Sequence, residues 1–127
     1  MGNGTSIGRV RGLGSAGHGA HDWLLQRLTS VGNLVLIPWL LISLALLPSH
    51  DYATVRGWVA QPLTATLLIL IMVNTIYHAR LGVREMLGDY VHDEGNKIAV
   101  MALANLLPFA GMAFGIVSVL RIALGGA

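Results

Sequence analysis

The chain carries three long apolar segments separated by short polar links. The segments run from about Val31 to Leu47, from Pro62 to Tyr77, and from Ile98 to Leu120. The second continues in helical register through a charged stretch that ends near Tyr90. Each segment approaches or reaches the roughly 20 residues that an α-helix needs to cross the hydrocarbon core of a bilayer. We therefore predict three transmembrane helices, over about residues 28–48, 60–89 and 97–122.

The links between the segments fix the expected topology. Only Pro48–Trp58 separates the first two segments, and only Val91–Lys97 separates the last two. Short links join helices that run antiparallel to each other as neighbours. The predicted fold is therefore an all-α membrane protein, with three transmembrane helices in an antiparallel bundle.

The N-terminal region has a different composition. Residues 1–20 are rich in Gly and Ser, have no apolar period, and predict a flexible tail ahead of a membrane anchor domain over residues 21–127. The tail lacks the apolar core of a signal peptide, so we do not expect it to be cleaved as one. Asp22 is a candidate N-cap for a short interfacial helix, Trp23–Ser30, that leads into the first span.

Composition supports a membrane protein and excludes several classes of function. Hydrophobic residues make up 54% of the chain and charged residues 11%, which is about half the usual charged share of a globular protein. A soluble domain of 127 residues could not bury this much apolar surface. The absence of cysteine excludes disulfides, thiolate catalysis and cysteine-ligated metal or iron–sulfur sites. The net charge of +2 and the scattered basic residues argue against nucleic-acid binding.

The basic residues also predict an orientation. One side of the membrane would carry Arg9, Arg11, Arg27, Arg80, Arg84 and Lys97, and the other side only Arg56 and Arg121. Cytoplasmic segments carry an excess of Lys and Arg. We therefore expect the N-terminus in the cytoplasm or mitochondrial matrix and the C-terminus on the opposite side.

The candidate chemistry lies at the end of the second span. His78 sits at the edge of the apolar run, where an imidazole costs free energy unless something binds it. His78 and Asp89 are eleven residues apart in the sequence. On an α-helix, their directions around the axis differ by only about 20°, so they lie on the same face, about 16 Å apart along the axis. Asn74 precedes His78 on this face by one turn, and Gly82 follows it by one turn, where a missing side chain would admit a flat group such as a haem. The pair Asp89-Tyr90 at the helix exit suggests proton chemistry at the membrane surface.

Ordinary structural roles are the alternatives at each position. His78 could hydrogen-bond a neighbouring helix, and Gly82 could permit close helix packing. Asp89-Tyr90 could be a solvated helix end with an interfacial tyrosine. His21 and Arg27 could be plain surface residues at the start of the first helix.

Two motifs resemble a known family. The segment from His21 through Asp22 and Trp23 to Arg27 is similar to the His-Asp-aromatic…Arg segment that precedes the first span of the smaller hydrophobic membrane anchor subunit of succinate dehydrogenase (succinate:quinone oxidoreductase). The second motif, His78-x3-Gly82-x6-Asp89-Tyr90-Val91, agrees with that family in residue types and spacing. The order of spans and the expected orientation also agree, and the resemblance covers about residues 20–122.

The resemblance implies roles for particular residues. His78 corresponds to the axial ligand of a haem b iron that is shared with a second anchor subunit. Asp89 and Tyr90 correspond to the acid and the tyrosine of the ubiquinone site. Arg27 and, less directly, His21 correspond to polar residues near the haem propionates. Arg80 and Arg84 depart from relatives that are more apolar after the ligand position.

The resemblance also implies partners and a location. The partners would be the second membrane anchor subunit, an iron–sulfur subunit and a flavoprotein subunit, so the chain alone would not be an enzyme. The complex would link the tricarboxylic acid cycle to electron transport as respiratory complex II, in a bacterial cytoplasmic or a mitochondrial inner membrane. The anchor of a related fumarate reductase is one alternative. A small homo-oligomeric transporter is another, although the three apolar cores contain no Asp or Glu to couple protons.

Overall fold

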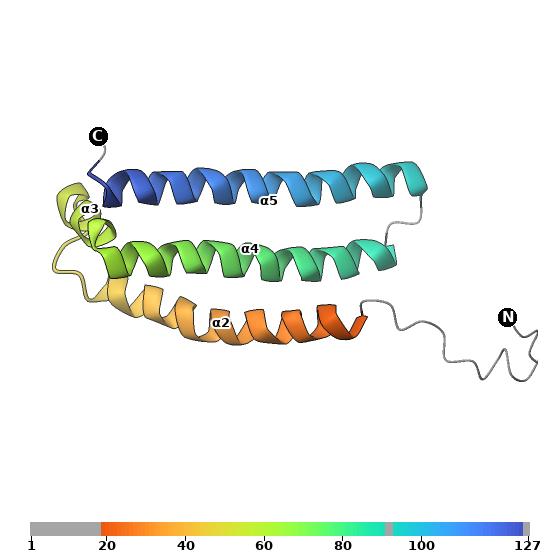
Figure 1. Ribbon diagram of the computed structural model, residues 1–127, viewed down its shortest axis with the longest axis horizontal. Helices are drawn as coiled ribbons and strands as arrows, with labels where there is room; N and C mark the ends of the chain where they lie inside the picture. Colours follow the sequence, from red (N-terminus) through yellow and green to blue (C-terminus); the bar gives the residue numbers. More distant parts are fainter. Residues whose placement is uncertain (1–18, 91–92, 126–127) are drawn as a thin grey trace, which may run out of the picture.

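Three long helices lie side by side and form the body of the molecule. The computed structural model describes residues 19–90 and 93–125, apart from the side chains of residues 88, 89 and 94. The helices are α2 (Gly19–Ala45), α3 (Tyr52–Ala60), α4 (Pro62–Tyr90) and α5 (Glu94–Ala123). Helix α4 lies between α2 and α5, and the short α3 packs across one end (Figure 1). Consecutive long helices run in opposite directions, so the predicted antiparallel all-α bundle is confirmed.

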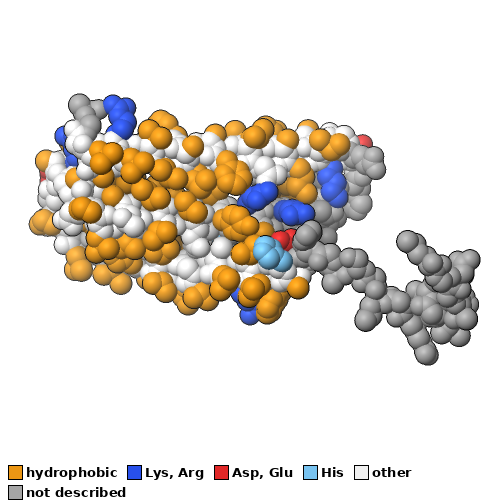
Figure 2. Space-filling view, viewed as in Figure 1, with side chains coloured by type: hydrophobic (Ala, Val, Ile, Leu, Met, Phe, Trp, Pro, Cys, Tyr) orange, Lys and Arg blue, Asp and Glu red, His pale blue; other side chains and the backbone are white. Residues whose placement is uncertain are grey.

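The three long helices have the length and apolarity of membrane spans. The qualifying segments are Gly19–Ala45, Pro62–Leu87 and Gly95–Ala123. Most apolar side chains point outward; Leu34 and Phe114, for example, are 74% and 77% exposed. Figure 2 shows apolar side chains over most of one face of the bundle. Lipid or partner chains must cover such a surface, because exposing so large an apolar area to water is unfavourable.

The first helix differs from its prediction. The prediction of a separate interfacial helix over Trp23–Ser30 is wrong, because α2 continues without a break from Gly19 to Ala45. The expected short helix is followed directly by Val31, and Gly32 just beyond it is accommodated within α2 and does not end the helix. Asp22 lies in the first turn instead of at the N-cap, where its negative charge still favours the helix dipole. Except for residues 19–20, the expected tail lies outside the described residues.

The link between the first two spans contains a helix that the sequence prediction omitted. Asp51 is the N-cap of α3, and its carboxylate accepts hydrogen bonds from the backbone N–H groups of Ala53 (3.1 Å) and Thr54 (3.2 Å). The Ser49 hydroxyl also donates to this carboxylate. Side-chain hydrogen bonds from Ser49 and Thr54 hold the pKa of Asp51 well below its ordinary value. A charged, fully engaged cap therefore starts α3.

Replacing Asp51 with Ala should loosen the start of α3. The amide hydrogens of Ala53 and Thr54 would lose their acceptor and exchange with solvent faster, which hydrogen–deuterium exchange can measure. Because folding lowers the pKa of Asp51, the cap's stabilisation is complete above the carboxyl's unfolded pKa and is lost as the pH falls through the folded value. The control is Asp51→Asn, which keeps a side-chain acceptor and should protect these amides better than Ala does. Equal exchange in wild type and Asp51→Ala would contradict the assignment.

Candidate functional site

Polar side chains join α2 to α4 in the half of the bundle that contains His78. We call this group the polar clasp; it consists of Thr29, Asn33, Asn74, Thr75 and His78. Asn74 Nδ2 donates to the backbone carbonyl of Thr29 and to Asn33 Oδ1, each at 2.8 Å. Thr75 Oγ1 donates to the same Asn33 oxygen at 3.0 Å. Polar groups inside an apolar helix pair are costly unless they are hydrogen-bonded, so the clasp fixes how the two helices meet.

His78 is the clasp residue nearest the charged end of α4. Its ring is half-buried, and Nδ1 lies 3.0 Å from Thr29 Oγ1. This contact confirms the structural alternative, in which His78 hydrogen-bonds a neighbouring helix, and the role of His78 as a haem ligand stays a prediction. The other ring nitrogen, Nε2, is the atom that remains for a ligand.

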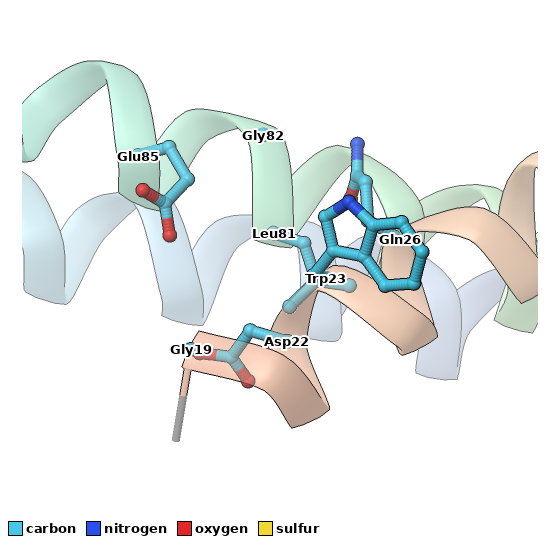
Figure 3. Close-up of a pocket in the computed structure, with 7 residues that line it drawn as sticks. All are labelled: Gly19, Asp22, Trp23, Gln26, Leu81, Gly82 and Glu85. Carbon is cyan, nitrogen blue, oxygen red and sulfur yellow. The ribbon is translucent and has the colours of Figure 1, made fainter. Parts of the chain in front are cut away.

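A cavity lies between the first turns of α2 and the later turns of α4. Its volume is about 460 Å³. The lining residues, which face one another from the two helices in Figure 3, are Gly19, Asp22, Trp23, Gln26, Leu81, Gly82 and Glu85. Gln26 Oε1 is buried there without a hydrogen-bond partner among the described residues. Gly82 thus faces an open space one turn, or about 6 Å, beyond His78 along α4.

Gly82 is not needed for contact between α2 and α4. A Cβ atom built there would meet Gln26 Nε2 at 3.9 Å, an ordinary contact distance. By contrast, a Cβ at Gly32 would come within 2.8 Å of Asn74 Nδ2. Close packing between the described helices therefore explains why position 32 has no side chain. It does not explain the glycine at position 82.

Several charged or ionisable side chains lie near the first turns of α2. Asp22 lies 3.7 Å from Arg84 Nη1 and 3.7 Å from His21 Nδ1. The His21 side chain is 68% exposed, so its pairing with Asp22 contributes little stability. The Arg27 guanidinium is exposed and lies 4.9 Å from the ring centroid of Trp23. Neither His21 nor Arg27 is among the described residues that line the cavity.

Arg80 and Arg84 have different surroundings. Arg80 Nε donates to Asn105 Oδ1 at 2.6 Å, and its guanidinium lies over the Phe109 ring at 5.6 Å. Arg80 therefore joins α4 to α5, whereas Arg84 faces Asp22 on α2. Neither residue contacts His78 through these interactions.

Tyr90 ends α4, at the same end of the bundle as the start of α2 (Figure 1). Its side chain is 79% exposed. Asp89 lies in the last turn of α4, but its side chain falls outside the described part, as does all of Val91. Tyr90 is therefore available to a partner chain or a ligand.

Comparison with known proteins identifies the family. The profile of the succinate dehydrogenase/fumarate reductase transmembrane subunit matches residues 1–113. The chain belongs to this family. It is a membrane anchor subunit of succinate dehydrogenase/fumarate reductase and a multi-pass membrane protein.

Similar relatives support the same assignment. The succinate dehydrogenase hydrophobic membrane anchor subunit of Rickettsia conorii is 31% identical over 88 residues, covering 68% of this chain and 70% of that protein. The subunits of the same name from Rickettsia bellii and Rickettsia typhi are 29% identical over 87 residues and 30% identical over 88 residues. These alignments cover 68% and 69% of this chain, and 70% of each relative. No solved structure matches this anchor significantly.

The sequence prediction missed part of the candidate site. It gives no role to Thr29 and Asn33, although they are polar, stand one helical turn apart, and fall at the start of an apolar segment. It puts Asn74 on the His78 face but does not identify its partners. The missing signal was the pairing of two polar positions on α2 with two on α4, which becomes visible once the helices are aligned antiparallel.

Proposed function

We propose that this chain holds haem b together with a second membrane anchor subunit, and that it contributes to the ubiquinone reduction site of succinate:ubiquinone oxidoreductase. The iron–sulfur and flavoprotein subunits would complete the complex. The observation that carries the proposal is His78, a half-buried imidazole with Nδ1 engaged by Thr29 and Nε2 left for iron. The matched relatives are named as succinate dehydrogenase subunits, which favours succinate oxidation over fumarate reduction.

The cavity beside Gly82, one turn beyond His78 on α4, supports a flat iron porphyrin at this place, although His78 itself is not among the described residues that line the cavity. Haem b supplies a one-electron redox centre when it is bound. His78 would hold the iron through Nε2, and Gly82 would let the group approach the α4 backbone beside the cavity. Arg27 and His21, at the start of α2, carry the positive or hydrogen-bonding groups that propionates require. His78 would hold the iron from this chain, and the second anchor subunit would supply the other ligand.

The ubiquinone site would use Tyr90 and Asp89 at the membrane surface. Electrons released from succinate in the soluble subunits would reach a quinone there. Quinone reduction takes up two electrons and two protons. The Tyr90 hydroxyl would donate a hydrogen bond to a quinone carbonyl, and Asp89 would relay protons from the aqueous side. The proposed orientation, with the N-terminus in the cytoplasm or matrix, puts these residues on the side of the soluble subunits.

Filling the space beside Gly82 tests the haem assignment. We expect the purified Gly82→Leu complex to retain haem about tenfold more weakly, because the new side chain would fill the space beside Gly82, one turn from His78, in which the proposed group would lie. Haem content per complex can be measured from the pyridine haemochrome spectrum. Gly82→Ala, whose Cβ would make only an ordinary contact inside this chain, should have a smaller effect.

The matched control for this test is Gly57→Leu. Gly57 also lies within a helix and has open space around it, but it belongs to α3 at the opposite end of the bundle. This variant should keep its full haem content. If Gly82→Leu also keeps haem in its native form, the group does not lie against Gly82.

A further inference from the structure

The Thr29 hydroxyl is buried directly against the proposed iron ligand. Thr29 is 8% exposed in a bundle where nearly every other described side chain reaches the surface. Its Oγ1 lies 3.0 Å from His78 Nδ1, across the contact between α2 and α4. The buried hydroxyl and the half-buried imidazole thus meet at hydrogen-bond distance between the two helices.

The direction of this hydrogen bond follows from the other contacts of Thr29. A threonine hydroxyl has one hydrogen to donate and two lone pairs that accept. Thr29 Oγ1 lies 2.8 Å from the Leu25 carbonyl oxygen and 3.1 Å from that of Gln26, and a carbonyl can only accept. The hydroxyl hydrogen is therefore used within α2, and Oγ1 accepts from Nδ1–H of His78. In that tautomer, Nε2 carries no hydrogen and presents a lone pair.

The rest of the polar clasp holds Thr29 in place. Asn74, one turn before His78 on α4, donates to the Thr29 backbone carbonyl at 2.8 Å and is itself tied to Asn33. Gly32 leaves room for the Asn74 amide, which a Cβ at that position would push aside. Asn74, on the same helix as His78, thus holds the backbone of Thr29 on α2. This contact fixes the Thr29 hydroxyl relative to the His78 imidazole.

We propose that Thr29 is a positioning residue for the haem ligand: it accepts the Nδ1 hydrogen of His78 and so sets the tautomer and ring orientation that present Nε2 to the iron. This proposal rests on the proposed function of His78. Partners of the non-ligating nitrogen orient a histidine ligand and raise its basicity. A more basic imidazole favours ferric iron, so loss of the hydroxyl should raise the midpoint potential of the haem.

The test compares Thr29→Val, Thr29→Ser and Ser30→Ala in the purified complete complex. Valine keeps the shape of threonine and removes the hydroxyl, whereas serine keeps the hydroxyl. Ser30 is the matched control, because its hydroxyl also donates to a carbonyl of α2 (Gln26, 2.7 Å) but is exposed. We measure the rate of haem transfer to excess apomyoglobin, the low-spin electron paramagnetic resonance signal, and the midpoint potential.

For Thr29→Val we expect haem transfer to be about tenfold faster, with altered g-values and a raised potential. Thr29→Ser and Ser30→Ala should match wild type. Unchanged transfer rate, g-values and potential in Thr29→Val would overturn the proposal. So would failure of both Thr29→Val and Thr29→Ala to assemble, assayed in membranes by immunoblot, since Thr29 would then act in helix packing.

These outcomes are separable from failure of the proposed function. If His78→Ala keeps the native haem signals, His78 is not a ligand and the role of Thr29 falls with it. If His78→Ala loses them while Thr29→Val matches wild type, the ligand assignment stands and only the positioning role is wrong.

Discussion

Replacing His78 with Ala should abolish the low-spin b-type spectrum that the proposed haem would give the purified complex. Alanine removes the half-buried imidazole whose Nε2 is proposed to bind iron, and leaves a space that lacks a nitrogen donor. The variant would lack the nitrogen donor that His78 would supply to the iron, so the ligation of the proposed haem would change. The reduced-minus-oxidised spectrum and the electron paramagnetic resonance signal of the ferric complex both report this change. The shape of these spectra is decisive, because haem can be retained with altered ligation.

A second histidine of the chain provides the control. His50 lies in the exposed link before α3, where Nε2 is 3.1 Å from the Leu44 carbonyl oxygen. His50→Ala should leave the spectrum unchanged. Native six-coordinate signals in assembled His78→Ala would mean that the iron takes its ligand elsewhere.

Much of the fold could be predicted because the bilayer imposes a simple requirement on sequence. Backbone groups in hydrocarbon must be satisfied within the helix, so a long apolar run predicts a span with few alternatives. The second span and its charged extension to Tyr90 form one helix, as the common face of Asn74, His78 and Gly82 requires. The antiparallel order followed from the short links alone.

The features that were missed depend on local capping and on contacts between helices. Helix α3 starts at a cap formed by Asp51 and Ser49, a signal confined to a few residues within a link. The prediction of an N-cap at Asp22 is wrong because the helix begins earlier, at Gly19, so Asp22 lies inside its first turn. Hydrogen bonds from Asn74 to α2 depend on helix rotation and register, which periodicity on one helix does not determine.

Positions within one helix could be predicted more readily than contacts between helices. Residue spacing places His78 and Gly82 on one face of α4, whereas the cavity beside Gly82 depends on how α2 packs against α4. The roles of these residues toward haem stay predictions. The surroundings of Asp22, between His21 and Arg84, could not be read from residue spacing. The exposed apolar surface and the open position of Tyr90 are what a chain that is completed by partners would present.

Removing only the hydroxyl of Tyr90 should slow quinone reduction while sparing the rest of the complex. Tyr90→Phe keeps the aromatic ring, and the side chain is 79% exposed, so the fold of this chain should lose little. A lost hydrogen bond to a neutral group costs about 1 kcal/mol, or about fivefold in rate, and more where charge develops on the quinone oxygen. We expect at least this decrease in succinate:quinone reductase turnover.

Three further measurements show whether the effect is confined to the quinone step. Haem content, subunit assembly and succinate oxidation by an artificial acceptor that bypasses the membrane should all remain at wild-type levels. Tyr52→Phe is the matched control, because Tyr52 is also 79% exposed but begins α3 at the other end of the bundle. If assembled Tyr90→Phe reduces quinone as fast as wild type and Tyr52→Phe, then Tyr90 anchors the helix end at the membrane surface, and the hydrogen bond to quinone comes from another residue.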